Sequence, residues 1–376
     1  MIYLDNSAGT RPYPEVIQTI TDVLTNHWGN ASADYSFGHD AMTIINNVTD
    51  QVAEDINCES DEIIWTSGAC EANSLAIDGF LKVNPYALLF STNLEHTSVS
   101  NAMNPQTTIK IPNDKYGNIK CDDLENILSN AYPPWNRKLV SISFANSEIG
   151  VIQDIKTIST IVHKYNGVLH VDATQMYPWY TIDVQDLGID MMSVSGQKMH
   201  CVKGIGFLYV RNGIELKPLI YGSQQDGRRG GTYPTHLIAA FGKALELTRV
   251  SYNVTEAVEG LRNKLLEHLL QIEGAHINGP LINANRLPNN ISLTIDNVSA
   301  STLTTMCDMM GIAIAKGSAC KSYEQKPSDT LLAIGLTPEQ ALNTIRISLD
   351  EFNSLKDVEC AANIITKLIE RIRNNG

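Results

Sequence analysis

Short apolar runs alternate with longer amphipathic stretches between about residues 60 and 210. Apolar runs of about 4–8 residues are typical of buried strands, whereas apolar positions three and four residues apart indicate a helix. The candidate strands are residues 63–66, 87–91, 107–111, 139–144, 168–171, 191–194 and 206–210, and helical patterns lie at 71–82 and 155–165. Strands that alternate with helices predict an α/β layer built on a mostly parallel sheet.

The pattern changes in the last third of the chain. Long helical patterns cover residues 237–252 and 255–272, short strands resume near residues 291–295, and an amphipathic helix runs from about residue 354 to 375. A new set of strands after two long helices indicates a second hydrophobic core. Chains longer than about 250–300 residues usually divide into domains, each with its own core. We therefore predict a large domain of residues 13–252 and a smaller domain that contains residues 253–376.

Composition and charge exclude several classes of protein. The chain is 43% hydrophobic and 18% charged, which is typical of a soluble globular protein. Its net charge of −13 argues against a broad nucleic-acid-binding face, because that charge repels the phosphate backbone. Seven cysteines without a CxxC pair favour a reducing cytoplasm over disulfides or zinc. We find no apolar run of 18 residues and no signal peptide, and so expect a cytoplasmic protein without a membrane span or a metal.

Two strand candidates end near groups that pyridoxal phosphate requires. The first is followed by Asp172, and 26 residues later the second ends in a turn of small residues that presents Lys198. Pyridoxal phosphate needs a lysine to form a Schiff base and a carboxylate to keep its ring nitrogen protonated. Taken alone, Asp172 could be a helix cap and Lys198 a surface lysine. Their pairing favours a pyridoxal-phosphate enzyme.

A possible anion cradle follows the strand at residues 63–66. The sequence Thr66-Ser67-Gly68-Ala69-Cys70-Glu71 opens a helical pattern, so its free backbone N–H groups can bind a phosphate at the positive end of that helix. The alternative is an ordinary tight turn with Ser67 as the N-cap.

Cys320 and Arg346 are the candidates for substrate chemistry. Cys320 lies in a segment of small residues, and the neighbouring Lys316 and Lys321 favour its thiolate. Such a cysteine can approach a substrate sulfur, although a cysteine can equally be an inert core residue. Arg346 lies in an alternating strand pattern, where it can hold a carboxylate with two parallel hydrogen bonds. The alternative for Arg346 is a salt bridge at the protein surface.

Together these segments resemble the cysteine desulfurases, which are members of the class V aminotransferase family. The matching segments are residues 3–8, 66–69, 95–96, 146–150, 170–175, 193–198, 229–232, 317–320 and 345–348. The resemblance implies fold type I of the pyridoxal-phosphate-dependent transferases. That fold has a large domain with a mixed, mostly parallel seven-stranded sheet and a smaller α+β C-terminal domain, to which residues 1–12 return.

The resemblance also implies the contacts of the cofactor. It assigns His96 to stacking on the ring and to proton transfer, and Gln175 to the phenolic oxygen. It assigns Ala69, Ser195 and Thr232 to the phosphate, with Thr232 reaching the cofactor of the neighbouring subunit. The implied assembly is a homodimer with shared active sites.

Three positions depart from the family pattern. This chain has Cys70 where the family has threonine, Ser147 where it has asparagine, and Gln197 where it has histidine. A thiol is a weak donor, so the contact of Cys70 with the phosphate is weakened. Ser147 and Gln197 remain polar, so we expect their contacts to the cofactor to persist directly or through water.

The predicted reaction converts L-cysteine to L-alanine. Arg346 holds the substrate carboxylate, Lys198 removes the α-proton, and Cys320 receives the sulfur as a persulfide for an acceptor protein. The sequence leaves the destination open among iron–sulfur clusters, thiolated tRNA and DNA phosphorothioation. The short end after the last helix favours a specialised acceptor. The alternatives are a selenocysteine lyase, a class V aminotransferase, or a sulfur-carrier or regulatory subunit of low turnover.

Overall fold

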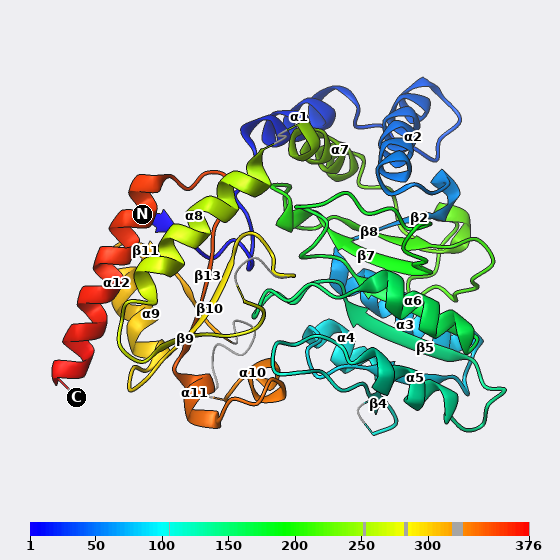
Figure 1. The fold of residues 1–376 in the computed structure, drawn as a ribbon. Coiled ribbons are helices and arrows are strands. Elements are labelled where there is room, and N and C mark those ends of the chain that lie inside the picture. Colours follow the sequence, from blue (N-terminus) through cyan, green and yellow to red (C-terminus); the bar gives the residue numbers. More distant parts are fainter. Residues whose placement is uncertain (105, 251–252, 282–284, 318–325, 376) are drawn as a thin grey trace.

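The computed structural model describes residues 1–104, 106–250, 253–281, 285–317 and 326–375 (Figure 1). Its larger sheet has seven strands in the order β2-β8-β7-β6-β5-β3-β4. These are β2 (Ile63–Thr66), β3 (Leu88–Ser91), β4 (Ile109–Lys110), β5 (Lys138–Ser143), β6 (Gly167–Asp172), β7 (Met191–Ser195) and β8 (Gly206–Val210). Neighbouring strands are parallel except at β8, which is antiparallel to both β2 and β7. The sheet confirms the predicted α/β class and its mixed, mostly parallel sheet of seven strands.

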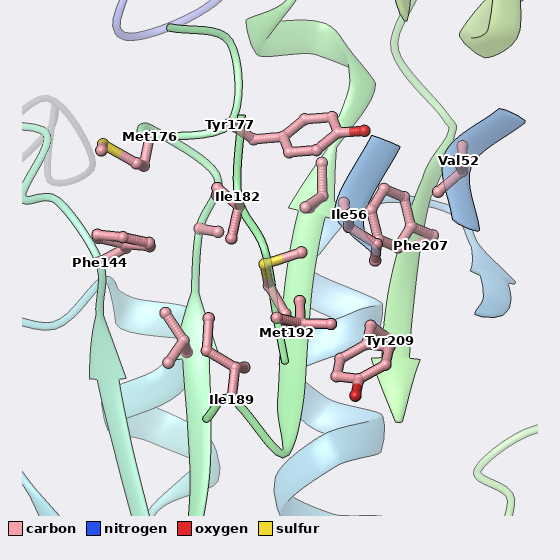
Figure 2. Packing of buried hydrophobic residues seen from close by; sticks show 14 of the residues in the cluster. Val52, Ile56, Phe144, Met176, Tyr177, Ile182, Ile189, Met192, Phe207 and Tyr209 are labelled. Atoms are coloured by element: carbon pink, nitrogen blue, oxygen red, sulfur yellow. The ribbon is translucent and has the colours of Figure 1, made fainter. Parts of the chain in front are cut away.

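Helices cover both faces of this sheet. On one face, α3 (Ala69–Val83) and α4 (Thr97–Ala102) pack against Leu89, Leu139 and Leu208 of the strands. The opposite face packs against α2 (Ser36–Ile56), α5 (Cys121–Ser129), α6 (Ile155–Lys164) and α7 (Thr235–Val250). Figure 2 shows part of this second layer, where side chains of the strands meet those of α2. Strands covered on both faces read as continuous apolar runs, which is why the sequence pattern located them.

A second, smaller sheet has its own core. Its strands, in the order β12-β13-β10-β9, are antiparallel: β9 (Ala275–Ile277), β10 (Asn290–Ile295), β12 (Ala315–Lys316) and β13 (Thr344–Ser348). The core beside it is built with α8 (Val254–Leu269), α9 (Ala300–Met309) and α12 (Leu355–Asn375). The N-terminal strand β1 (Ile2–Tyr3) pairs with β11 (Ile312–Ala313), and the buried Leu4 belongs to the same core. We propose that the boundary between the two domains lies near residue 253, between α7 and α8.

Some elements differ from the sequence pattern. The strand expected over residues 107–111 is only Ile109–Lys110, because it forms the exposed edge of the sheet and Pro112 cannot donate a hydrogen bond. The apolar pattern indicated neither α1 (Pro14–Asn26) nor α2, and it placed α3 two residues too late. The short helices α10 (Asp329–Ala333) and α11 (Pro338–Leu342) precede β13. None of the described helices is long and apolar enough to cross a bilayer.

Candidate active site

A cavity of about 450 Å³ lies at the carboxyl ends of the parallel strands. Parallel strands bring their carboxyl ends to one edge of the sheet, where open α/β folds bind ligands. The volume lies within the range of about 300–1,000 Å³ that is usual for small-molecule sites. The cavity brings together ten of the predicted site residues: Ala69, Cys70, His96, Ser147, Asp172, Gln175, Ser195, Gln197, Lys198 and Arg346.

Asp172 is the last residue of β6 and is 6% exposed. Its Oδ2 accepts a hydrogen bond of 2.8 Å from Asn73 Nδ2, and its Oδ1 accepts one of 3.0 Å from the backbone N–H of Thr174. Asn73 lies on α3 and is fully buried. The two donors fix the carboxylate at the floor of the cavity, where it can face a protonated ring nitrogen.

Lys198 ends a short 3₁₀ turn, Gly196–Lys198, that follows β7. Its Nζ donates hydrogen bonds of 2.7 Å to the backbone carbonyls of both Ser7 and Ala8. Gln175 Nε2 donates to the same Ser7 carbonyl at 3.1 Å. The N-terminal segment therefore orients the amino group of Lys198 within the cavity.

The start of α3 forms the anion cradle. Its N-cap residue is Gly68 rather than Ser67, with a φ of +143° that favours glycine, and no side chain caps the first turn. The first N–H groups of the helix are thus open to an anion. The carboxylate of Glu71 accepts a hydrogen bond of 2.7 Å from the backbone N–H of Ser67 and forms a salt bridge of 2.8 Å with Arg229. Burial opposes charge on Glu71, but the hydrogen bonds from Arg229 and Ser67 outweigh it and lower the pKa of its carboxyl.

Arg346 approaches the cavity from β13 of the second sheet and is 4% exposed. One of its terminal nitrogens donates to Asp5 Oδ1 at 2.7 Å. Its Nε–H is buried without a hydrogen-bond partner among the described residues. A buried guanidinium N–H without a partner is costly, so its presence beside the cavity fits an anionic ligand that completes the set.

Glu95, which lies in the matching segment 95–96 but had no predicted role, is a second carboxylate near the site. It accepts hydrogen bonds of 2.6 Å from the hydroxyls of both Thr92 and Ser143. Burial, to which the nearby charge of Asp172 adds, raises the pKa of Glu95 to about 7. His170, on β6, is fully buried, and burial lowers its pKa to about 4.

Two predicted site residues are not part of the described cavity. Thr232 lines a smaller neighbouring cavity of about 190 Å³ together with Ser67 and Gly204. Cys320 lies outside the described residues. Residues without a predicted role also contact the site, among them Asp5, Asn73 and Ser98. The only sequence signal for Asn73 is an amide within the otherwise apolar face of α3.

The chain matches known proteins over nearly its whole length. It matches the aminotransferase class-V family over residues 2–360. It is similar to cysteine desulfurase IscS 1 of Archaeoglobus fulgidus, with 34% identity that covers 100% of this chain and 98% of that protein. A solved NifS-like protein from Rickettsia africae shares 30% identity with a TM-score of 0.89, covering 100% of this chain and 99% of that one. A structure of SspA in complex with cysteine shares 29% identity with a TM-score of 0.81, covering 94% of this chain and 100% of that one.

The raised pKa of Glu95 predicts a pH-dependent difference in stability. Burial disfavours the ionised form of this carboxyl in the folded protein. The contribution of the protonated carboxyl to the free energy of unfolding is therefore fully present below the ordinary pKa of 4.5 and is lost as the pH rises through about 7. Glu95→Gln should therefore gain stability relative to the parent between pH 5 and pH 8, by up to about 3 kcal/mol. Melting temperatures of both proteins across this pH range test it. A difference that does not change with pH would contradict it.

Proposed function

The chain belongs to the aminotransferase class-V family, as its sequence predicted, and we propose that it is a pyridoxal-phosphate-dependent cysteine desulfurase. It converts L-cysteine to L-alanine and passes the sulfur to an acceptor. The observation that carries the proposal is the meeting of Lys198, Asp172 and Arg346 at one cavity. Similarity to proteins named cysteine desulfurases, over nearly the whole of each chain, supports the choice of reaction.

The residues at the cavity fit pyridoxal phosphate. The uncapped start of α3 at Ala69 and Cys70, with Ser195, can hold the phosphate. The buried Asp172 can pair with the ring nitrogen, and Lys198 can bind the cofactor covalently. When bound, pyridoxal phosphate supplies a Schiff-base carbon and a ring that takes up the electrons of a broken bond.

The remaining contacts follow the family resemblance. His96 would stack on the ring and Gln175 would bind the phenolic oxygen, while Ser147 and Gln197, which also line the cavity, would add polar contacts. Thr232, which lies outside the main cavity, would serve the cofactor of a second subunit. The proposed assembly is thus a homodimer.

The substrate is held by its carboxylate. Arg346 offers the Nε–H that has no other partner among the described residues, and its bond to Asp5 fixes the plane of the guanidinium. Planar guanidinium groups bind carboxylates through parallel hydrogen bonds. The amino group of Lys198 would take the α-proton of the bound amino acid.

The sulfur leaves the substrate as a persulfide. We assign Cys320 as the thiolate that attacks the substrate sulfur: the new S–S bond forms, the carbon–sulfur bond breaks, and its electron pair stays with the carbon. Protonation of that carbon gives alanine. A sulfur-acceptor protein or a thiol then takes the outer sulfur from Cys320.

The competing functions differ in product. A class V aminotransferase needs no cysteine nucleophile and releases no sulfide, and a selenocysteine lyase prefers the selenium substrate. A sulfur-carrier or regulatory subunit of low turnover would bind the cofactor but release little alanine. The relative SspA, solved with cysteine bound, supports cysteine as the substrate class here.

We further propose a cytoplasmic location and an acceptor in a specialised pathway.

Lys198→Ala should abolish both the covalently bound cofactor and the release of alanine from cysteine. The physical reason is that no other lysine lines the described cavity. The absorbance spectrum of the purified protein and a turnover assay measure the two effects. Lys203→Ala, just beyond the same turn, is the matched control. Normal turnover of Lys198→Ala would refute the assignment.

Cys320→Ser should leave the cofactor spectrum and its response to added cysteine unchanged, yet lose the release of sulfide. A hydroxyl cannot replace the thiolate as a sulfur acceptor. Cys360→Ser, which alters an exposed cysteine on α12, is the matched control and should behave as the parent. Sulfide release by Cys320→Ser at the parental rate would show that another thiol accepts the sulfur.

Arg346→Ala should raise the KM for cysteine by about two orders of magnitude, since truncating one partner of a buried charged pair costs on the order of 2–5 kcal/mol. Arg346→Lys keeps the positive charge but lacks the planar pair of donors, so its KM should lie between that of the parent and that of Arg346→Ala. Steady-state kinetics with cysteine measure the effect. An unchanged KM in Arg346→Ala would place the carboxylate elsewhere.

A further inference from the structure

A continuous chain of hydrogen bonds joins His96 to Asp172. His96 Nδ1 lies 2.7 Å from the hydroxyl of Ser98, and the Ser98 hydroxyl accepts from Asn73 Nδ2 at 2.9 Å. The same Asn73 nitrogen donates to Asp172 Oδ2 at 2.8 Å. The chain crosses from α4 through α3 to β6, and its two ends line the cavity.

The direction of every hydrogen bond in this chain is determined by chemistry. An ionised carboxylate only accepts, so the NH₂ group of Asn73, and not its carbonyl, faces Asp172. The second hydrogen of that NH₂ group points to Ser98 Oγ. Ser98 Oγ accepts there, and its own hydrogen can donate to His96 Nδ1, provided that this nitrogen carries no proton.

A second donor acts on the same ring nitrogen. The backbone N–H of Ser98 donates to His96 Nδ1 at 3.1 Å, as part of the N-cap of α4. A backbone N–H cannot reverse its polarity, so a proton on Nδ1 would face another proton. The lone pair of His96 therefore lies on Nδ1 and its proton on Nε2.

We propose that Ser98 is a positioning residue that holds His96 as the neutral tautomer with its proton on Nε2 and couples the ring to the charge of Asp172. The catalytic use of this tautomer rests on the proposed function. His96 then has its Nε2–H as the hydrogen-bond donor of the ring, while Ser98 engages the lone pair on Nδ1. Asn73 and Ser98 thus determine which ring nitrogen of His96 can donate.

The alternative is that Ser98 only completes the N-cap of a short helix. That role needs only its backbone N–H, which every substitution other than proline retains. A capping role therefore predicts no change in the ring of His96 when only the hydroxyl is removed. The two interpretations can be separated at the ring itself.

Nitrogen NMR of the full-length protein, labelled with ¹⁵N in its histidines, reads the tautomer directly. The resonances of His96 are identified by their loss in His96→Gln. We expect a single tautomer protonated at Nε2 in the parent and in Ser98→Thr, and a changed Nδ1 resonance in Ser98→Ala. Ser100→Ala, in the same helix, is the control. A proton on Nδ1 in the parent would overturn the proposal.

A double-mutant cycle tests the coupling to Asp172. In Asp172→Asn the Asn73 amide is no longer held in one orientation, so the ring nitrogens of His96 should shift. In the Ser98→Ala background the same substitution should shift them by less than half as much. Equal shifts in the two backgrounds would show that the hydroxyl carries no coupling. These measurements do not depend on any turnover of cysteine, so they stand apart from the proposed function.

The loss of the Ser98 hydroxyl should affect kcat and leave KM nearly unchanged. Ser98→Ala should lower kcat for cysteine about tenfold or more, with KM within about twofold. This loss is smaller than the 10²–10⁴-fold contribution of a general acid–base group, because His96 itself remains. Ser98→Thr should restore kcat. An unchanged kcat in Ser98→Ala, with the NMR change present, would refute the positioning role in catalysis.

Discussion

The buried carboxylate of Asp172 determines the arrangement of the site around it. The register of β5, β6 and β7 places it between Ser143 and Ser193 at the edge of the sheet. Its charge turns the Asn73 amide toward it and adds to the raised pKa of Glu95. A charge in such a position is tolerated only because Asn73 and Thr174 donate to it. The same constraint makes the site ready for a cationic ring nitrogen.

The N-terminal segment links the two sheets across the cavity. Strand β1 pairs with β11 of the second core, and the carbonyls of Ser7 and Ala8 accept from Lys198 of the first. Between them, Asp5 binds Arg346. Seven residues thereby fix the lysine and the arginine relative to each other, which the chemistry of an α-amino acid requires.

The sequence predicted the parts of the site that follow regular patterns. The buried strands have apolar runs, so Asp172 and Lys198 could be placed at strand ends, and Arg346 in an alternating strand. The contacts of Asp5 and Asn73 could not be predicted, because they join residues far apart in the chain: Asp5 and Arg346 are 341 residues apart, and Asn73 and Asp172 are 99 apart. No local pattern records such pairs. The helices α1 and α2 were missed for a different reason. The buried Ala41, Ile45, Val48 and Val52 of α2 do recur three and four residues apart, but the predicted pattern began only near residue 60.

The most direct test is to find where the sulfur goes in a single turnover. The purified protein is mixed with a limited amount of L-cysteine, free and persulfide sulfurs are trapped by alkylation, and the peptides are analysed by mass spectrometry while alanine is measured. The proposed function predicts one extra sulfur on the peptide that contains Cys320, and one alanine for each such sulfur. Alanine formed without sulfur on that peptide, or no alanine at all, would contradict it.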